Sequence, residues 1–273
     1  MKAITDILNV SRSNLYEKKL QTVRTGFYRK NDDGYYLQLI REITDERPTY
    51  GYRRVTAVLN RRLKQAGQPV VNHKRVYRIM KIHNLLLQRH TGRAVRVHDG
   101  KVITLGSNTR WCSDSFEIPC WNGERVRVAF SMDCCDREVL SYISTTAGIC
   151  SDMIQDLMAG SVENRFGFVD QLPQPIEWLS DNGPPYVAHQ TRKFGTMMGF
   201  RICTTPYYSP ESNGMAESFV KTFKRDYVQM HPLHDARTTM EQLPIWFEDY
   251  NKNHPHKGLK MLSPIEFRNK QLS

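Results

Sequence analysis

No segment of this 273-residue chain approaches the run of roughly 20 apolar residues that a membrane-spanning helix needs. The first residues, Met1 to Asp6, are interrupted by charge too soon to form the apolar core of a signal peptide. We therefore expect a globular protein with no membrane partner. The length allows one or two hydrophobic cores, and the composition, 40% hydrophobic and 25% charged, is that of a globular chain.

Several common catalytic and metal-binding signatures are also missing. The nine histidines form no H-E-x-x-H pair and no paired Cys/His ligand set, which argues against a zinc protease or a zinc finger. There is no G-x-S-x-G elbow to support a Ser-His-Asp hydrolase. The cysteines show no C-x-x-C spacing, so we expect small free thiols in a reducing compartment. They are Cys112, Cys120, Cys134, Cys135, Cys150 and Cys203.

Charge is distributed unevenly along the chain. Residues 1–110 carry 23 Lys and Arg against 8 Asp and Glu, whereas residues 111–273 carry 16 against 20. A basic front half is the electrostatic signature of a phosphate-rich partner such as nucleic acid. The acidic back half would repel a polyanion unless cations neutralise part of its charge. Together the two signs favour a metal-dependent catalytic domain that follows a DNA-binding domain.

Residues 1–32 are predicted to hold two short helices. Ile4 and Leu8 share one face of the first, and Ser11 is a plausible N-cap for the second, over 12–20. A helix, a tight turn and a second helix resemble the last two helices of a helix-turn-helix. Because the first helix of such a core is missing, we interpret the segment as a partial helix-turn-helix, with an ordinary helical hairpin as the alternative.

Residues 33–93 are predicted to form a helical DNA-binding domain, and a linker is expected over 94–109. Apolar residues at helical spacing indicate three helices, the first broken near Pro48 and the second closed by Gly67. The third follows a capping Asn72 and carries basic residues opposite its apolar face. A charged helix face is often only solvated, but this density of cations favours contact with a DNA groove. The basic residues are Lys74, Arg75, Arg78 and Lys81.

The hydrophobic period changes near residue 110, and residues 110–273 are predicted to form an α/β domain. Three consecutive strands, then alternating helices and strands, indicate a mixed five-stranded sheet flanked by helices. The strands are expected at 111–119, 126–132, 139–147, 176–181 and 200–204, with Gly183-Pro184-Pro185 as a stop after the fourth. The helices are expected at 152–165, 189–198, 212–230 and 238–251.

Two aspartates of this domain stand where chemistry is plausible. Asp114 lies within an expected strand between apolar neighbours, where an unpaired carboxylate would be costly unless a cation partners it or that side is exposed. Asp181 follows the fourth strand, and ligands collect at the C-termini of strands in α/β sheets. An ordinary Asp-Asn-Gly turn explains Asp181 equally well when it is considered alone.

A third acid, Glu217, stands on the long helix of the same domain. Lys221 and Lys224 follow at i+4 and i+7, so all three side chains share one face. The alternative is a surface Glu–Lys pair, worth about 0.3–0.5 kcal/mol. In the functional interpretation Glu217 is a metal ligand and the two lysines contact the DNA backbone beside it.

Three carboxylates suit the cleavage of a phosphodiester, which builds negative charge on an anionic centre. Two Mg²⁺ ions roughly 4 Å apart can activate the attacking oxygen and stabilise the leaving one. Mg²⁺ takes oxygen ligands and keeps several waters, so a few carboxylates suffice. Asp114, Asp181 and Glu217 are therefore the candidate catalytic and metal-binding residues, with no nucleophilic side chain required.

These residues carry a family resemblance. Trp111-x-Ser113-Asp114, Ser180-Asp181-Asn182-Gly183 and Ser209-Pro210-Glu211-Ser212-Asn213-Gly214-Met215-Ala216-Glu217 resemble the DDE core of insertion-sequence transposases related to retroviral integrases, and 35 residues separate the second and third acids. Tyr250-Asn251, Pro255-His256, Gly258-Leu259 and Ser263-Pro264-x-x-Phe267 are similar to the tail of the OrfB type, and Tyr50-Gly51-Tyr52-Arg53-Arg54 and Val71-Asn72-x-Lys74 to Met80 to its helical domain. The resemblance spans most of residues 33–267. His254 departs from it, because many relatives have arginine before the Pro-His pair.

The resemblance implies an RNase H-like integrase catalytic core over 110–273, preceded by the helical domain. It also implies DNA transposition that depends on two Mg²⁺ ions, with Mn²⁺ able to substitute, and a DNA contact at Lys224. Such relatives are often made as frameshift fusions with an upstream-frame product and act as multimers on DNA, in the bacterial cytoplasm at the nucleoid. The alternatives are a DNA-binding regulatory fragment without catalysis and an RNase H-like nuclease that cleaves without joining strands.

Overall fold

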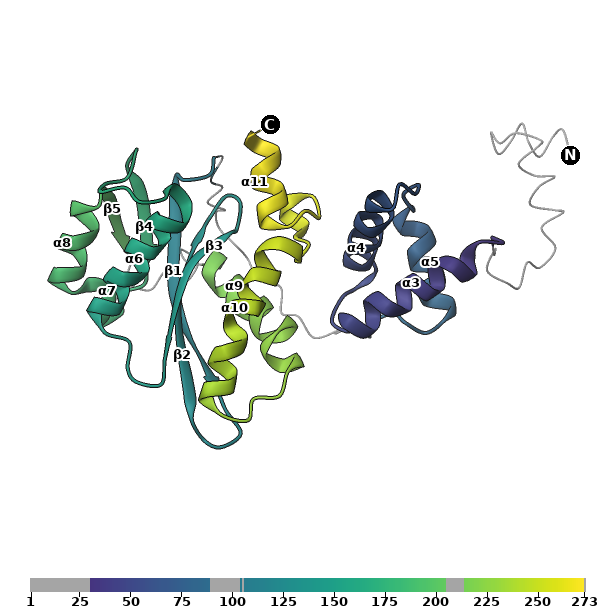
Figure 1. Ribbon diagram of the computed structural model, residues 1–273, viewed down its shortest axis with the longest axis horizontal. Coiled ribbons are helices and arrows are strands. Elements are labelled where there is room, and N and C mark those ends of the chain that lie inside the picture. Colours follow the sequence, from purple (N-terminus) through teal and green to yellow (C-terminus); the bar gives the residue numbers. More distant parts are fainter. Residues whose placement is uncertain (1–29, 89–103, 105, 205–213, 273) are drawn as a thin grey trace, which may run out of the picture. The chain divides into compact units, whose positions relative to one another are not determined.

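The computed structural model describes residues 30–88, 104, 106–204 and 214–272, and these divide into two compact units (Figure 1). One unit ends at Leu87, and the other begins at Gln88. The expected partial helix-turn-helix lies outside the described residues over 1–29, as does most of the expected linker. Each unit has a hydrophobic core of its own.

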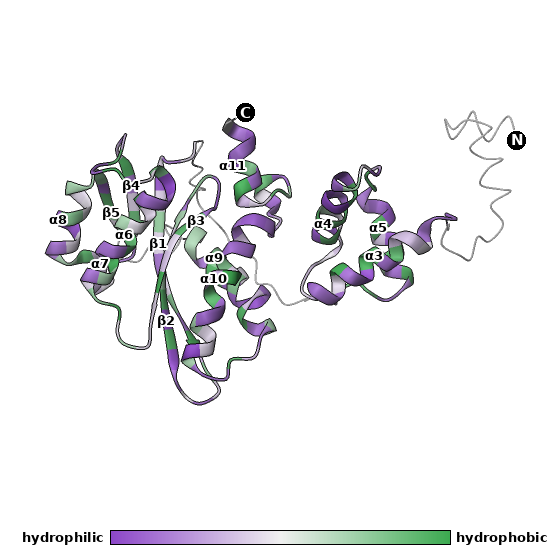
Figure 2. Cartoon of the chain, in the orientation of Figure 1, coloured by the Kyte–Doolittle hydropathy of each residue, from purple (hydrophilic) through white to green (hydrophobic). Residues whose placement is uncertain are grey.

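The first unit is a three-helix domain, as the apolar spacing predicts. Its helices are α3 (Asp33–Glu46), α4 (Tyr52–Gln65) and α5 (His73–Ile82). Each buries one apolar stripe against the other two, with Ile40, Leu59 and Val76 fully enclosed. The predicted cap of the third helix is confirmed, because the Asn72 side chain accepts a hydrogen bond from the Lys74 amide at 2.9 Å. Figure 2 shows the polar faces of these helices.

The second unit is a mixed five-stranded sheet flanked by helices, which confirms the predicted fold class. Its elements are β1 (Arg110–Pro119), β2 (Arg125–Asp133), β3 (Val139–Thr145), α6 (Ser151–Phe166), β4 (Ile176–Ser180), α7 (Pro184–Val187), α8 (His189–Met197), β5 (Phe200–Thr204), α9 (Gly214–Asp226), the 3₁₀ turn Val228–Met230, α10 (Ala236–Asn253), the 3₁₀ turn Lys257–Leu259 and α11 (Pro264–Leu272).

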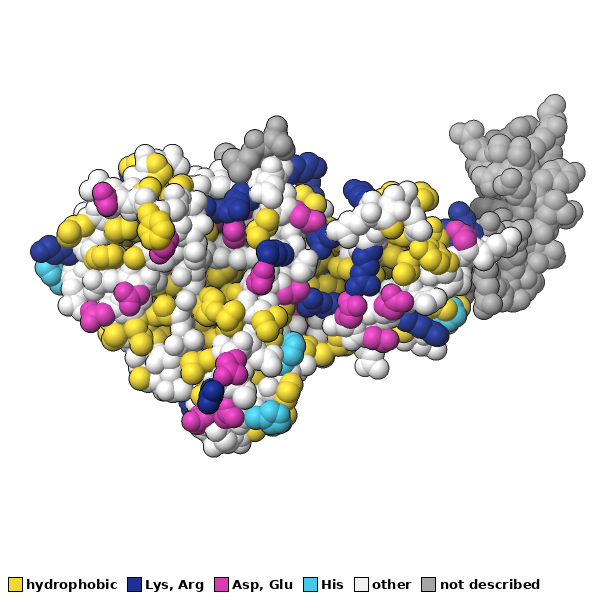
Figure 3. Space-filling view, in the orientation of Figure 1, with side chains coloured by type: hydrophobic (Ala, Val, Ile, Leu, Met, Phe, Trp, Pro, Cys, Tyr) yellow, Lys and Arg dark blue, Asp and Glu magenta, His cyan; other side chains and the backbone are white. Residues whose placement is uncertain are grey.

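The strands lie in the order β3-β2-β1-β4-β5. Neighbouring pairs among β1, β2 and β3 are antiparallel, whereas β4 is parallel to both β1 and β5. Alternating side chains of β1 therefore enter different cores on the two faces. Trp111 packs with α6 and α7, and Cys112 packs with α9 and α10. The face of this unit seen in Figure 3 carries Asp and Glu side chains interspersed with Lys and Arg.

The core under α9 and α10 is rich in aromatic rings, which hold α9 against the sheet. The Phe219 and Phe130 ring centroids lie 4.5 Å apart, and those of Phe223 and Phe247 lie 4.6 Å apart. The residues that resemble the OrfB tail join this core. His254 is fully buried and stacks on Tyr250, so the position that departs from the family pattern is a packing position.

Some elements differ from the sequence prediction. The expected Gly-Pro-Pro stop after β4 is instead the short helix α7, because proline fits the first turn of a helix, where its missing N–H has no intrahelical partner. The long helix expected over 212–230 ends at Asp226, with a 3₁₀ turn after it, and residues 212 and 213 lie outside the described part. All six cysteines are free, with Cys150 exposed. No helix in the described part is long and apolar enough to cross a membrane.

Candidate active site

Asp114 lies on β1, the central strand, just beyond the last residue that pairs with β4. The parallel pairing of these strands ends where Cys112 stands opposite Leu179. Cys112 and Phe116 are buried on the same face of β1, whereas Asp114 between them is only half-buried. The Asp114 carboxylate therefore lies where β1 is no longer paired with β4. One of its oxygens, Oδ1, accepts the Ser115 amide at 2.7 Å.

Asp181 directly follows β4, level with Asp114 along the two parallel strands. Its Oδ1 accepts the Gly183 amide at 3.0 Å. A Cβ atom at Gly183 would lie 3.0 Å from that same oxygen, which is closer than ordinary van der Waals contact. Glycine at this position thus lets the turn close tightly around the carboxylate.

Tyr186 on α7 is a component of this region that the sequence analysis missed. The Ser113 hydroxyl lies 2.8 Å from the Phe130 carbonyl oxygen and 3.2 Å from the Tyr186 hydroxyl. Burial raises the pKa of Tyr186, and the negative charges of Asp114 and Asp181 raise it further. The tyrosine thus joins α7 to β1 behind the two acids. No periodic pattern marks a single aromatic residue in a four-residue helix.

Glu217 is in the first turn of α9, with a half-exposed carboxylate that lies 3.8 Å from the Lys221 ammonium. The ammonium of Lys224, two turns further along the helix, stands 5.6 Å from the centroid of the Phe116 ring. Phe116 is two positions from Asp114 on β1. This contact brings the outer face of α9 to the part of β1 that carries the aspartate.

The charges of Asp181 and Glu217 act on Asp114. Burial raises the pKa of Asp114 to about 6, the Ser115 amide opposes that rise, and the charges of Asp181 and Glu217 add to it. Asp114, Asp181 and Glu217 therefore share one region of negative potential, although they come from three separate segments. Their donors are all carboxylate oxygens, and a hard divalent cation bound among them would relieve this repulsion.

The carboxylates do not form a compact cage. Within the described ranges, no three His, Cys, Asp or Glu side chains stand close enough together to hold one ion at once. Each acid instead has a local partner, namely the Ser115 amide, the Gly183 amide or the Lys221 ammonium. The residues suit ions that are each bound by one or two carboxylates and completed by water or phosphate oxygens.

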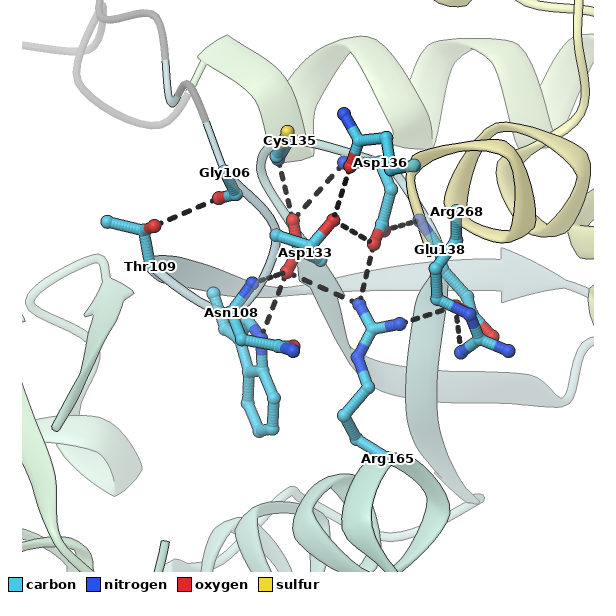
Figure 4. A network of polar contacts seen from close by, with 12 residues as sticks. Gly106, Asn108, Thr109, Asp133, Cys135, Asp136, Glu138, Arg165 and Arg268 are labelled. Carbon is cyan, nitrogen blue, oxygen red and sulfur yellow. Dashed lines mark hydrogen bonds and ion pairs between the residues drawn. The ribbon is translucent and has the colours of Figure 1, made fainter. Parts of the chain in front are cut away.

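A second acid cluster, at the end of β2 and in the connection from β2 to β3, has a different character (Figure 4). Asp133, Asp136 and Glu138 surround Arg165, whose guanidinium lies 2.8 Å from both Asp136 and Glu138. Asp133 also accepts the Asn108 amide at 2.6 Å. These acids are almost fully buried, and cationic or amide donors satisfy them. The cluster is a structural network, and the functional candidate is the less satisfied set around Asp114.

The candidate DNA-contact residues of α5 fall into two groups. Lys74 and Lys81 are exposed. Arg75 and Arg78 are instead only 15% and 17% exposed, and both form ion pairs with Asp33 at the start of α3, at 2.8 and 2.6 Å. The sequence pattern placed all four on one basic face, whereas the structure separates them.

Comparison with known proteins agrees with this organisation. An HTH-like domain model matches residues 30–93, and two integrase core domain models match 105–210 and 198–264. The chain is similar to the transposase InsD for insertion element IS2A/D/F/H/I/K of Escherichia coli, with 50% identity over 88% of this chain and 80% of the relative. InsD of insertion element IS2-9 of Escherichia coli K12 is also 50% identical, over 88% of this chain and 78% of that protein.

A solved structure shares the fold. It is a chain from the simian T-cell lymphotropic virus intasome in complex with PP2A regulatory subunit B56 gamma, with a TM-score of 0.50. The similarity covers 84% of this chain and 73% of that chain at 16% identity, so it bears on the fold alone. The IS2 relatives support the family assignment, and the resemblance carried by the motifs around the three acids is confirmed. The chain belongs to the family of insertion-sequence DDE transposases that includes InsD of IS2.

Proposed function

We propose that Asp114, Asp181 and Glu217 are the catalytic carboxylates of this transposase and the ligands of its divalent metal ions. The observation that supports this best is the raised pKa of Asp114, because two acids from remote segments contribute to it beside burial. Perturbed pKa values cluster at functional sites, and a grouping of carboxylates alone is suited to divalent cations that in turn bind a phosphodiester. We further propose Mg²⁺ as the metal, with two ions per site and Mn²⁺ as a substitute.

The protein's own part in the chemistry is to hold oxygens in place. When bound, the ions would supply charge stabilisation for the attacking and leaving oxygens. The Ser115 and Gly183 amides each fix one oxygen of an aspartate, which limits rotation of the carboxylates. Glu217 stands on a helix that aromatic packing holds against the sheet. Rigid support of this kind keeps the acids aligned through two successive reactions.

Both reactions are phosphoryl transfers without a covalent enzyme intermediate. First, a water oxygen attacks the phosphorus at the element end and gives up a proton, the bond from that phosphorus to the 3′-oxygen breaks, and the 3′-oxygen takes up a proton. The freed 3′-hydroxyl then attacks a phosphorus of the target strand and gives up its proton, the bond from that phosphorus to the target 3′-oxygen breaks, and the displaced oxygen takes up a proton. We propose that Lys221 and Lys224 contact phosphates beside this site.

We propose two further partners for the chain. The first is an upstream-frame product, joined to this chain by frameshifting, which supplies tight recognition of the element ends. The second is another copy of the chain, because two DNA ends must be held together during transfer. The DNA affinities of the fusion and of the isolated chain can be compared by titrating each protein against labelled end DNA. Equal and tight binding by both would contradict the first proposal, and a monomer in the active DNA complex would contradict the second.

Strand transfer from pre-cut, labelled end DNA tests the catalytic assignment. Asp114→Asn, Asp181→Asn and Glu217→Gln should each abolish joining in Mg²⁺ or Mn²⁺ while DNA binding stays nearly intact. Glu241→Gln removes an exposed acid of α10, 62% exposed, and should keep full activity as the matched control. EDTA should stop the reaction of the wild type. Joining retained by any of the three variants would remove that residue from the site.

The same assay separates the alternative functions. Cleavage of intact end DNA without joining would indicate a nuclease, and retention of DNA without any reaction would indicate a regulatory fragment. The assay should be run on the isolated chain and on the fusion, so that poor end binding is not mistaken for lack of chemistry.

A further inference from the structure

Helices α4 and α5 of the first unit, together with the residues beside them, have an unusual charge. Residues 51–88 contain nine Lys and Arg but no Asp or Glu. On α5 the residues Val76, Ile79 and Met80 face the core. The exposed side of the same helix carries His73, Lys74, Tyr77 and Lys81. Spacings of three and four residues place these four on one continuous face.

Arg75 and Arg78 point away from that face. Both guanidinium groups form ion pairs with Asp33, as described above, and the Arg75 guanidinium carbon also lies 4.5 Å from the centroid of the Tyr36 ring. Tyr36 belongs to α3 and is buried. These contacts attach α5 to the beginning of α3. Breaking them to reach DNA would leave Asp33 without its cations, so the two arginines act in the packing of the domain.

Tyr77 stands on the exposed face with a supported ring. It is 40% exposed, and its ring meets that of Tyr52 edge-on at a centroid distance of 5.1 Å. His73 stacks on the same Tyr52 ring, and the Arg53 Nε donates to the Tyr52 hydroxyl at 3.1 Å. Tyr52 is half-buried and packs on the core. It therefore holds an exposed tyrosine, a histidine and an arginine in fixed positions around it.

The connection between α4 and α5 is also fixed. It is longer than the three- or four-residue turn of a compact helix-turn-helix. The Asn60 side chain compensates for this length, since it accepts the Val71 amide at 2.7 Å and donates to the Val71 carbonyl at 3.0 Å. Both hydrogen bonds hold the end of the connection on α4. The start of α5 is thereby fixed relative to Tyr52.

We propose that His73, Lys74 and Tyr77, with Arg53 at the start of α4, form the surface of this domain that lies on duplex DNA, and that Tyr77 enters the major groove. This inference rests on the proposed action of the chain on DNA. In a helix-turn-helix, the N-terminal residues of the second helix contact base edges while the first helix meets the backbone. Lys74 and Arg53 are suited to phosphates, and the Tyr77 ring to the methyl group of thymine.

The two kinds of contact differ in their response to salt. A lysine or arginine that neutralises one phosphate contributes about 0.9 to the slope of log K against log salt. A neutral tyrosine contributes nothing to that slope, although its loss weakens binding at every salt concentration. Because Tyr52 already restricts the Tyr77 ring, little rotamer freedom remains to be lost on binding.

The first test measures binding of the full chain to a 30-base-pair duplex over a range of NaCl concentrations. Lys74→Ala and Arg53→Ala should each reduce the salt slope by about 0.9. Tyr77→Ala should weaken binding severalfold with the slope unchanged. Arg41→Ala removes an exposed arginine of α3 and should behave as wild type. Arg75→Gln and Arg78→Gln should lower the melting temperature of the domain, measured by circular dichroism. At temperatures where the domain is folded, both variants should bind DNA with the salt slope of wild type.

The second test detects contact directly. The methyl groups of thymine in the same duplex are replaced by iodine, and the complex is irradiated so that aromatic side chains in the major groove become crosslinked. Mass spectrometry should locate the crosslink at Tyr77. The proposal would be overturned by a retained duplex that crosslinks only outside α5, or by Arg75→Gln and Arg78→Gln losing salt slope while Lys74→Ala does not.

These outcomes are independent of the catalytic assignment. If the carboxylate variants keep strand transfer while Tyr77 crosslinks, the proposed active site fails and the DNA surface stands. If the carboxylate variants lose transfer while Tyr77 does not crosslink, the reverse holds. A wild-type chain that binds no duplex at any salt concentration would refute the DNA surface itself.

Discussion

Replacing Arg165 with methionine should severely destabilise the catalytic unit. The guanidinium is 3% exposed and forms ion pairs with Asp133, Asp136 and Glu138, two of which are completely buried (Figure 4). Methionine retains much of the packing volume but leaves three acids without their shared cation. Breaking a buried ion pair by removing one partner costs about 3–5 kcal/mol, so we expect a loss of at least that order.

The loss should depend on pH, and the pKa shifts give its direction. Burial raises the pKa of Asp133 and of Glu138 even with Arg165 present. A carboxyl group whose pKa is raised by folding stabilises the protein below its unfolded value, near 4, and this contribution disappears as pH rises through the folded value. Without Arg165 both pKa values rise further. The Arg165→Met variant should therefore be less destabilised at pH 5 than at pH 8.

Urea denaturation followed by tryptophan fluorescence measures this effect in the right part of the molecule. All four tryptophans belong to the catalytic unit, so the signal is not mixed with unfolding of the helical domain. Arg268→Met is the matched control, because Arg268 is 28% exposed and, within the described residues, forms a single ion pair, to Glu138 at 2.6 Å. It should lose about 1 kcal/mol or less. Equal losses in the two variants, or an Arg165→Met loss that is the same at pH 5 and pH 8, would refute the reasoning.

Two further predictions concern the site and its scaffold. Gly183→Ala should reduce strand transfer at least tenfold with little change in the urea midpoint, because the added Cβ would displace the Asp181 carboxylate. Gly148 has open space around it, so Gly148→Ala should transfer strands at the wild-type rate. Asn251→Ala should lower the free energy of unfolding in urea by about 1–3 kcal/mol. The reason is that the Asn251 side chain forms hydrogen bonds with both the amide and the carbonyl of Val139 at the start of β3. A urea midpoint equal to that of wild type would contradict this role.

The order of elements in the catalytic unit could be predicted because its local signals are strong. Alternation of apolar residues predicted the strands within a few positions, and the motifs around Asp114, Asp181 and Glu217 carried the resemblance to the family. Element boundaries were less accurate where proline was involved. Pro184 was interpreted as a stop, although the physical preference of proline for the first turn of a helix makes it an equally good start.

Periodic patterns in the sequence could not predict contacts between residues that are distant in sequence. Arg75 and Arg78 share a charged sequence pattern with Lys74, and nothing local distinguishes an arginine that pairs with Asp33 from a lysine that faces solvent. Tyr186 was missed for a similar reason, because its importance comes from Ser113, which is remote in sequence. In both cases the tertiary partner decides the role of the side chain.

The two acid clusters of the catalytic unit show why composition alone does not locate an active site. Both contain three carboxylates, and Asp133, Asp136 and Glu138 are closer together in sequence than the acids around Asp114. Burial with Arg165 and several backbone amides uses their hydrogen-bonding capacity within the fold. Within the described residues Asp114 instead accepts one amide, and its pKa is raised mainly by burial, with the charges of Asp181 and Glu217 adding to the rise. The acids that the protein satisfies less completely are the ones that we propose bind cations and a phosphodiester.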